Sequence, residues 1–146
     1  MHRRLDRDSE ELHYLGITDL AKLIRDKKLS PLELTHYMLD RIKKVDCQLN
    51  SYAYVSTDLA VAAAHKAENE INDGLYRGLM HGIPIAFKDN CYLRNAAIAG
   101  GLSSERTFYP EYDATVVTKL LQAGAVPLGK LRMTEGALSG YPTVEP

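Results

Sequence analysis

The residue with the clearest potential for chemistry is Lys88, which ends a short apolar run. The run reads His81-Gly82-Ile83-Pro84-Ile85-Ala86-Phe87-Lys88-Asp89. A buried ammonium is costly, so a lysine in such a place is either paired with an acid or used in a reaction. Lys88 is therefore a candidate general base. The alternative is that its stem packs while its ammonium reaches water or Asp89.

A lysine can act as a base only while its amine is neutral. Its ordinary pKa is about 10.4, so neutrality near pH 7 requires the ammonium to be disfavoured by roughly 4 to 5 kcal/mol. Desolvation at the end of a buried strand can supply this. The neutral amine can then take a proton from a serine hydroxyl, as in Ser-Lys hydrolases.

Two other stretches have spacings close to those of a P-loop and of a Gly-x-Ser-x-Gly turn, but each lacks a residue that defines the motif. Residues 124–130 have the spacing of a P-loop, yet Leu131 stands where a Ser or Thr would hold magnesium. The residues between the two glycines are also apolar, which favours a strand over a phosphate-binding loop. The run Gly101-Leu102-Ser103-Ser104-Glu105 lacks the second glycine of a Gly-x-Ser-x-Gly turn. We interpret it as part of a loop.

The first half of the chain is predicted to be helical, apart from one short strand. Its elements are a helix capped by Thr18, a helix beginning at Ser30-Pro31-Leu32-Glu33, a strand over 50–55, and a helix opened by Thr57 or Asp58 and stopped by Gly74. Ser30 at the N-cap, Pro31 in the first turn and Glu33 at the capping-box position make the second start the strongest signal.

The second half is predicted to alternate strands with a helix. Its elements are a buried strand over 83–87, a long loop over 91–110, a helix from the N-cap Asp113 to Gly124, a buried strand over 125–128, and one or two helical turns over 133–138. Strand, helix and strand in this order favour parallel strands and a three-layer α/β sandwich. We expect one domain over 15–146, preceded by a polar tail over 1–14.

Composition excludes several function classes. The 146 residues carry a net charge of −1, with 45% apolar and 25% charged residues, so we expect neither a nucleic acid nor a membrane as partner. No apolar run has the length of a membrane span or of a signal core. Cys47 and Cys91 form no Cys-x-x-Cys pair, and the five histidines have no metal-ligand spacing. We expect reduced thiols in a cytoplasmic protein without metal or cofactor.

Several segments resemble the amidase signature family. Residues 78–90 resemble its first signature stretch, and residues 113–117, 121–131 and 133–137 resemble the helix and strand that follow it there. The helix that begins at Ser30 and the alanine-rich helix after Val55 lie where the family has them. The resemblance covers nearly the whole chain from about Leu15 onward.

The resemblance implies a partial three-layer α/β/α amidase fold and hydrolysis of a carbon–nitrogen bond by a Ser-Ser-Lys triad. Lys88 matches the catalytic lysine, while His81 and Gly82 would lead into its strand and Asp89 would be a structural partner. Both family serines would fall past residue 146. The loop that usually carries threonine and serine near its glycines has Ile98, Ala99 and Leu102 here.

We therefore expect the N-terminal part of an amidase for small linear amides, inactive alone because a triad acts as a unit. One alternative is the amidase subunit of a tRNA-dependent amidotransferase. A second is a non-catalytic remnant that binds a partner chain. An incomplete sheet would expose a strand edge, which favours a homo-oligomer or pairing with another chain.

Overall fold

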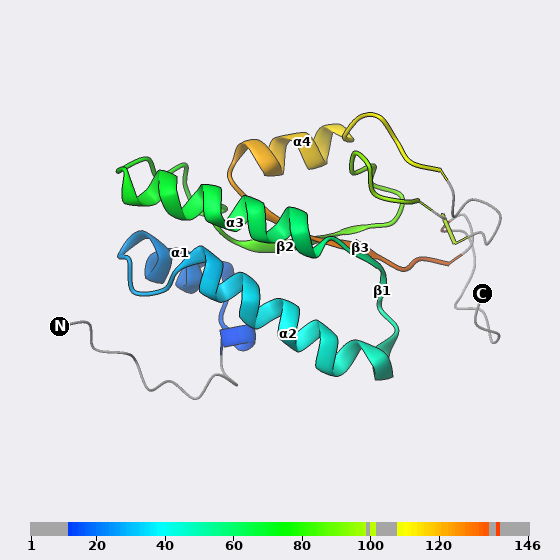
Figure 1. Ribbon diagram of the computed structural model, residues 1–146, viewed down its shortest axis with the longest axis horizontal. Coiled ribbons are helices and arrows are strands. Elements are labelled where there is room, and N and C mark those ends of the chain that lie inside the picture. Colours follow the sequence, from blue (N-terminus) through cyan, green and yellow to red (C-terminus); the bar gives the residue numbers. More distant parts are fainter. Residues whose placement is uncertain (1–11, 99, 102–107, 135–136, 138–146) are drawn as a thin grey trace.

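The computed structural model describes residues 12–98, 100, 101, 108–134 and 137. The helices are η1 (Leu12–Tyr14), α1 (Ile17–Arg25), α2 (Pro31–Leu49), α3 (Thr57–Asn72) and α4 (Thr115–Gln122), and the strands are β1 (Tyr52–Val55), β2 (Pro84–Lys88) and β3 (Val126–Leu131). In the view of Figure 1, α1 and α2 lie on one side of the strands and α4 on the other. The α/β class predicted from the sequence is confirmed.

The three strands form one sheet in the order β1-β3-β2. β2 and β3 run parallel, as the strand–helix–strand order predicted, and the predicted short strand β1 joins the sheet antiparallel to β3. Phe87 lies beside Lys130, and Lys88 beside Leu131. Successive side chains on a strand point to opposite faces, so Lys88 and Lys130 lie on opposite faces of the sheet.

The strong start signal at Ser30 is confirmed. Its hydroxyl oxygen accepts hydrogen bonds from the backbone N–H groups of Leu32 (3.0 Å) and Glu33 (3.2 Å), and its own O–H donates to Glu68. α2 ends at Asn50, which adopts a left-handed conformation with φ 50°. Such a C-cap satisfies helix-end backbone groups and turns the chain toward β1.

Two other capping predictions are wrong. α1 takes Gly16 as its N-cap, so Thr18 lies within the helix. α4 takes Ala114 as its N-cap, while the Asp113 carboxylate accepts a hydrogen bond from the backbone N–H of Arg94 at 2.7 Å. Asp113 therefore ties the loop after β2 to the start of α4 instead of capping the helix.

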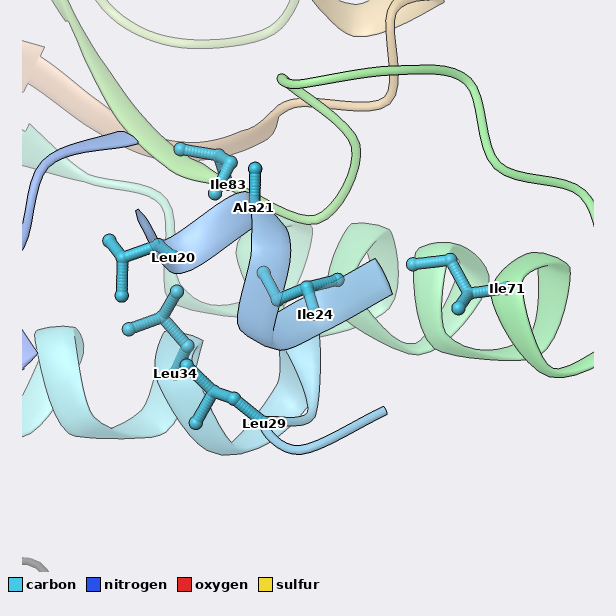
Figure 2. Packing of buried hydrophobic residues seen from close by; sticks show 7 residues of the cluster. All are labelled: Leu20, Ala21, Ile24, Leu29, Leu34, Ile71 and Ile83. Atoms are coloured by element: carbon cyan, nitrogen blue, oxygen red, sulfur yellow. The ribbon is translucent and has the colours of Figure 1, made fainter. Parts of the chain in front are cut away.

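The core consists of three clusters. The first joins α1, α2, α3 and the start of β2, and Figure 2 shows its members Leu20, Ala21, Ile24, Leu29, Leu34, Ile71 and Ile83. In the second, Ala60 and Ala64 of α3 pack on Val126 and Leu128 of β3. In the third, Phe87 of β2 packs with Val117 of α4. The alanine face predicted for α3 thus lets that helix approach β3 closely.

Three further predictions meet the structure only in part. Leu12–Tyr14, predicted as the end of a polar tail, forms a 3₁₀ helix, and Leu12 packs against the first cluster. The rest of that tail, residues 1–11, lies outside the described residues. Of the helical turns predicted over 133–138, residues 135, 136 and 138 also lie outside them, and the loop over 91–110 contains one isolated bridge, between Ile98 and Phe108.

Candidate active site

Lys88 is the last residue of β2, and its side chain is exposed to solvent. Its Nζ donates a hydrogen bond to the backbone carbonyl oxygen of Arg132 at 2.6 Å. The sequence led us to expect an amine kept away from water. In this chain the described residues do not supply that desolvation, so the amine is held in place without being buried.

The carbonyl that holds Lys88 is itself fixed by β1. The backbone N–H of Arg132 donates to Ser51 at 2.8 Å, and its Nε donates to the Tyr52 carbonyl at 3.3 Å. The Asp46 carboxylate in turn accepts from the backbone N–H groups of Ser51 (2.8 Å) and Tyr52 (3.2 Å). Burial raises the pKa of Asp46, but the hydrogen bonds from Ser51 and Tyr52 outweigh it and lower that pKa. The end of β2 is thus anchored to the end of α2 through Arg132.

The lysine that is fully buried is Lys130 on β3, with 0% of its surface exposed. Its Nζ donates to the backbone carbonyl of Asp89 at 2.8 Å and lies 3.4 Å from Oδ1 of the same residue. Burial lowers the pKa of Lys130, while the negative charge and hydrogen bond of Asp89 act in the opposite direction. This pairing is the usual condition under which a lysine can be buried.

Asp89 is buried as deeply as its partner, with 2% exposure. Its backbone N–H donates to the Leu131 carbonyl at 3.0 Å, and its Oδ2 accepts from the backbone N–H of Gly100 at 2.8 Å. Asp89 therefore joins the end of β2, the end of β3 and the glycine loop. This agrees with the structural role expected for Asp89, but its lysine partner is Lys130 and not Lys88.

Sequence reasoning missed the role of Lys130. Lys130 appeared in the rejected P-loop spacing and in the segment 121–131 that resembles the family, but no role was assigned to it. The second parallel strand was predicted to end at Leu128, two residues before the lysine. The structure continues β3 through Leu131, which supports the rejection because the supposed phosphate loop is a strand. A usable signal was present: Lys130, like Lys88, closely follows an apolar strand, and Asp89 offers an acid one residue from the other strand's end.

A second polar network lies at the opposite end of β2, around the fully buried His81. His81 Nδ1 accepts from the backbone N–H of Arg77 at 3.1 Å, and its Nε2 lies 3.0 Å from Oε2 of Glu70. Two guanidinium nitrogens of Arg77 bind the Glu70 carboxylate at 2.8 and 2.7 Å. These bonds, with the smaller effect of His81, lower the pKa of Glu70 to about 2. Burial lowers the pKa of His81, which favours the neutral ring.

This network borders a groove of about 540 Å³ between α3 and α4, whose lining includes Ala63, Ala67, Leu121 and Pro127. Lys88 is not among the lining residues. The candidate base and the groove thus lie at different places in the fold. His81 is fully buried and both of its ring nitrogens have partners, which fits the packing role expected for a residue that leads into the strand.

The histidines, cysteines and acidic residues of the described segments do not gather into a ligand cluster. In that part of the chain, no group of three or more His, Cys, Asp or Glu side chains could hold a metal ion. Cys47 and Cys91 are free thiols. None of the helices among these residues has the length and apolar character needed to cross a bilayer.

Comparison with known proteins decides the family. The family model described as Amidase matches residues 33–145, which include β2, Lys88 and β3. The chain belongs to the amidase signature family. AmiD of Mycobacterium tuberculosis, which is named as an amidase, is 49% identical to it over 138 residues, covering 94% of this chain and 29% of AmiD. One subunit of the glutamyl-tRNA(Gln) amidotransferase of Pseudomonas aeruginosa is 42% identical over 127 residues, covering 87% of this chain and 26% of the relative.

The fold comparison agrees with the sequence comparison. The peptide amidase of Stenotrophomonas maltophilia superposes with a TM-score of 0.81 at 32% identity, covering 87% of this chain and 26% of the amidase. The chain therefore spans less than a third of the length of the relatives it matches. What it shares with them is the segment that holds Lys88 and the Asp89–Lys130 pair.

Proposed function

We propose that this chain is the lysine-bearing part of a Ser-Ser-Lys amidase that hydrolyses small linear amides. The observation that carries the proposal is the position of Lys88 within the matched segment. Its amine is reachable from solvent at the end of a parallel strand and is oriented by the Arg132 carbonyl. Lys130 is unsuited to the same task because it is fully buried and bound to Asp89. The two free cysteines fit a cytoplasmic enzyme.

In the proposed reaction, the neutral amine of Lys88 takes a proton from a bridging serine, which takes one from the nucleophilic serine. The serine oxygen attacks the amide carbonyl, and the carbon–nitrogen bond breaks as the same relay returns a proton to the leaving nitrogen. Water then hydrolyses the acyl-serine ester. Sequence that supplies both serines would also have to cover Lys88, because this chain leaves its side chain in water.

The test is a chimaera in which this chain replaces the 138-residue region of AmiD that it matches. We expect the chimaera to hydrolyse simple amides. Lys88→Met, which keeps the length of the side chain without the amine, should lower kcat by about 10²- to 10⁴-fold, the usual contribution of a general base. Lys119→Met, at an exposed lysine on α4, is the matched control and should leave kcat unchanged. Full turnover by the Lys88 variant would remove this residue from the mechanism.

The same assay applied to the 146-residue chain alone should give no turnover, because a triad acts as a unit. Hydrolysis by the isolated chain that disappears in Lys88→Met would mean that its nucleophile lies within these residues. That result would contradict the assignment of both serines to other sequence, while leaving the role of Lys88 intact.

A second candidate function is the amidase component of an amidotransferase, which the 42% identity to the Pseudomonas protein favours. Such a protein would release ammonia from glutamine and pass it to a partner. Two chimaeras distinguish the functions: the one with AmiD, and a second in which this chain replaces the matched 127-residue region of the Pseudomonas subunit. Glutamine turnover that rises when the other amidotransferase components are added supports the second function. Equal turnover of simple amides with and without them supports the first.

We also propose that the outer edge of β2 accepts another strand. β2 is hydrogen-bonded to β3 on one side, and among the described residues no strand pairs with its other side. Parallel strands are usually enclosed, and an open edge invites pairing. A strand from the part of an amidase that the match does not cover is the proposed occupant. Size-exclusion chromatography of the isolated chain tests this. Dimers or larger species would support pairing through the open edge of β2, and a stable monomer at high concentration would contradict it.

A further inference from the structure

Asp89 directly follows the exposed Lys88 in the sequence, yet the buried Asp89–Lys130 pair and the Lys88 side chain lie on different faces of the sheet. We propose that the Asp89–Lys130 pair is a positioning device, which fixes the strand end that carries Lys88 and holds the glycine loop at Gly100 beside it. This inference rests on the proposed function, because it assigns the pair to the site of the candidate base.

Several hydrogen bonds meet at this strand end. The Asp89 carbonyl accepts from Lys130 Nζ at 2.8 Å, and the Asp89 N–H donates to Leu131 at 3.0 Å. Directly before these groups, the Lys88 carbonyl accepts from the N–H of Cys91 at 2.9 Å. The Lys88–Asp89 peptide group and the peptide group that follows Asp89 are therefore both held, which fixes the backbone directly after Lys88.

Residues 130–132 contact both the backbone that follows Lys88 and the amine at the tip of its side chain. Lys130 and Leu131 bind Asp89, and the next residue, Arg132, supplies the carbonyl that receives Lys88 Nζ at 2.6 Å. Three consecutive residues thus hold the backbone after Lys88 and the tip of its side chain. A displacement of Lys130 would move the root and the acceptor of Lys88 together.

The charge of the pair also points to positioning. Replacing a buried ion pair by apolar residues of similar volume is often neutral or stabilising, so a buried pair is poor grounds for a purely stabilising role. A carboxylate offers something that an apolar side chain cannot. Asp89 uses one oxygen for Lys130 and the other for the N–H of Gly100 at 2.8 Å. The pair therefore sets the distance between the strand end and the glycine loop.

Lys130 is a positioning residue and not a second base. It has no exposed surface, and its amine is directed at the carbonyl and carboxylate of Asp89. A substrate that approaches Lys88 from solvent would meet the other face of the sheet.

The test uses the 146-residue chain and NMR signals that do not depend on catalysis. The Lys88 Nζ signal, assigned by its loss in Lys88→Arg, reports the contact with Arg132, and the hydrogen-exchange protection of the Gly100 amide reports the contact with Asp89. In Lys130→Met and in Asp89→Asn we expect the Lys88 signal to shift and the Gly100 protection to fall. Lys130→Arg, which keeps the charge, should recover part of both.

Ile24→Ala is the matched control, because it removes buried volume from the first core cluster without touching the pair. It should lower stability while leaving both signals in place. Unchanged Lys88 and Gly100 signals in folded Asp89→Asn would overturn the proposal, even if Lys130→Met does not fold. Failure of the chimaera to hydrolyse amides, with the NMR coupling present, would instead reject the proposed function and leave the positioning role standing.

Discussion

Polar side chains are buried at both ends of β2, but they are paired with different partners at the two ends. At the leading end, His81 is fully buried, and both ring nitrogens find partners in Arg77 and Glu70. At the trailing end, a charged pair is buried between β2 and β3, and one residue away an exposed lysine is held by a carbonyl. At the leading end, burial and hydrogen bonding leave no ring nitrogen of His81 available for chemistry. The trailing end keeps an amine oriented and accessible, which packing alone does not require.

The comparison is sharpest between the two lysines of the trailing end. Removing one partner of a buried ion pair leaves an uncompensated charge, which costs about 3–5 kcal/mol. We therefore expect Lys130→Met to lower the free energy of unfolding by about that amount. Lys88→Met, at an exposed side chain, should change it by no more than about 0.5 kcal/mol. Urea unfolding followed by circular dichroism measures both.

The double variant Lys130→Met/Asp89→Asn checks the cause. It removes both charges, so it should recover part of the stability lost in Lys130→Met alone. A larger loss in Lys88→Met than in Lys130→Met would reverse the roles given to the two lysines. Equal losses in the single and double variants would mean that the unpaired carboxylate is not the source of the cost.

A side chain added at Gly124 should disrupt the packing around His81 at the leading end of β2. This residue has φ +88°, and an added Cβ would lie 2.3 Å from Cδ2 of His81. Gly124→Ala should therefore combine strain in the left-handed region with overpacking, at a total cost of about 2–4 kcal/mol.

Gly74 provides a matched control for this change. Its φ is +91°, but an added Cβ would meet nothing within 4 Å. Gly74→Ala should cost only the backbone strain, about 1–2 kcal/mol. The difference between the two variants in thermal or urea unfolding isolates the contact with His81. Equal costs would show that His81 can move aside, and that the leading end is less tightly packed than its burial indicates.

The sequence was sufficient for the features that depend on local chemistry. Ser30 with Pro31 fixed the start of α2, and the apolar runs fixed the two parallel strands. Local patterns could not reveal partners that are distant in the chain. Asp113 is a residue type favoured at N-caps, but its carboxylate accepts a hydrogen bond from the backbone N–H of Arg94, 19 positions away in a loop. The partner of Asp89 lies 41 residues later, beyond the point where apolar character ended the predicted strand. Lys88 was located correctly at a strand end, but its exposure depends on which segments cover it.

The leading end should also respond to acid. Burial lowers the pKa of His81 in the folded chain, so the unfolded chain binds a proton first as the pH falls below about 6.5. Stability should therefore decrease with falling pH below that value, by at most about 1.4 kcal/mol per pH unit for one proton. Glu70 acts in the same direction at lower pH, because its pKa falls from 4.5 to about 2 on folding. Its contribution should be lost as the pH falls through that window.

His81→Gln separates the two contributions, because an amide can accept from the Arg77 N–H and donate to Glu70 without titrating. In this variant the curve of unfolding free energy against pH should flatten between about pH 6.5 and 5, while the loss below about pH 4.5 remains. A curve that keeps its slope in the upper window would show that the slope does not come from His81. The acid sensitivity would then not belong to the leading end, and the contrast between the two ends of β2 would rest on packing alone.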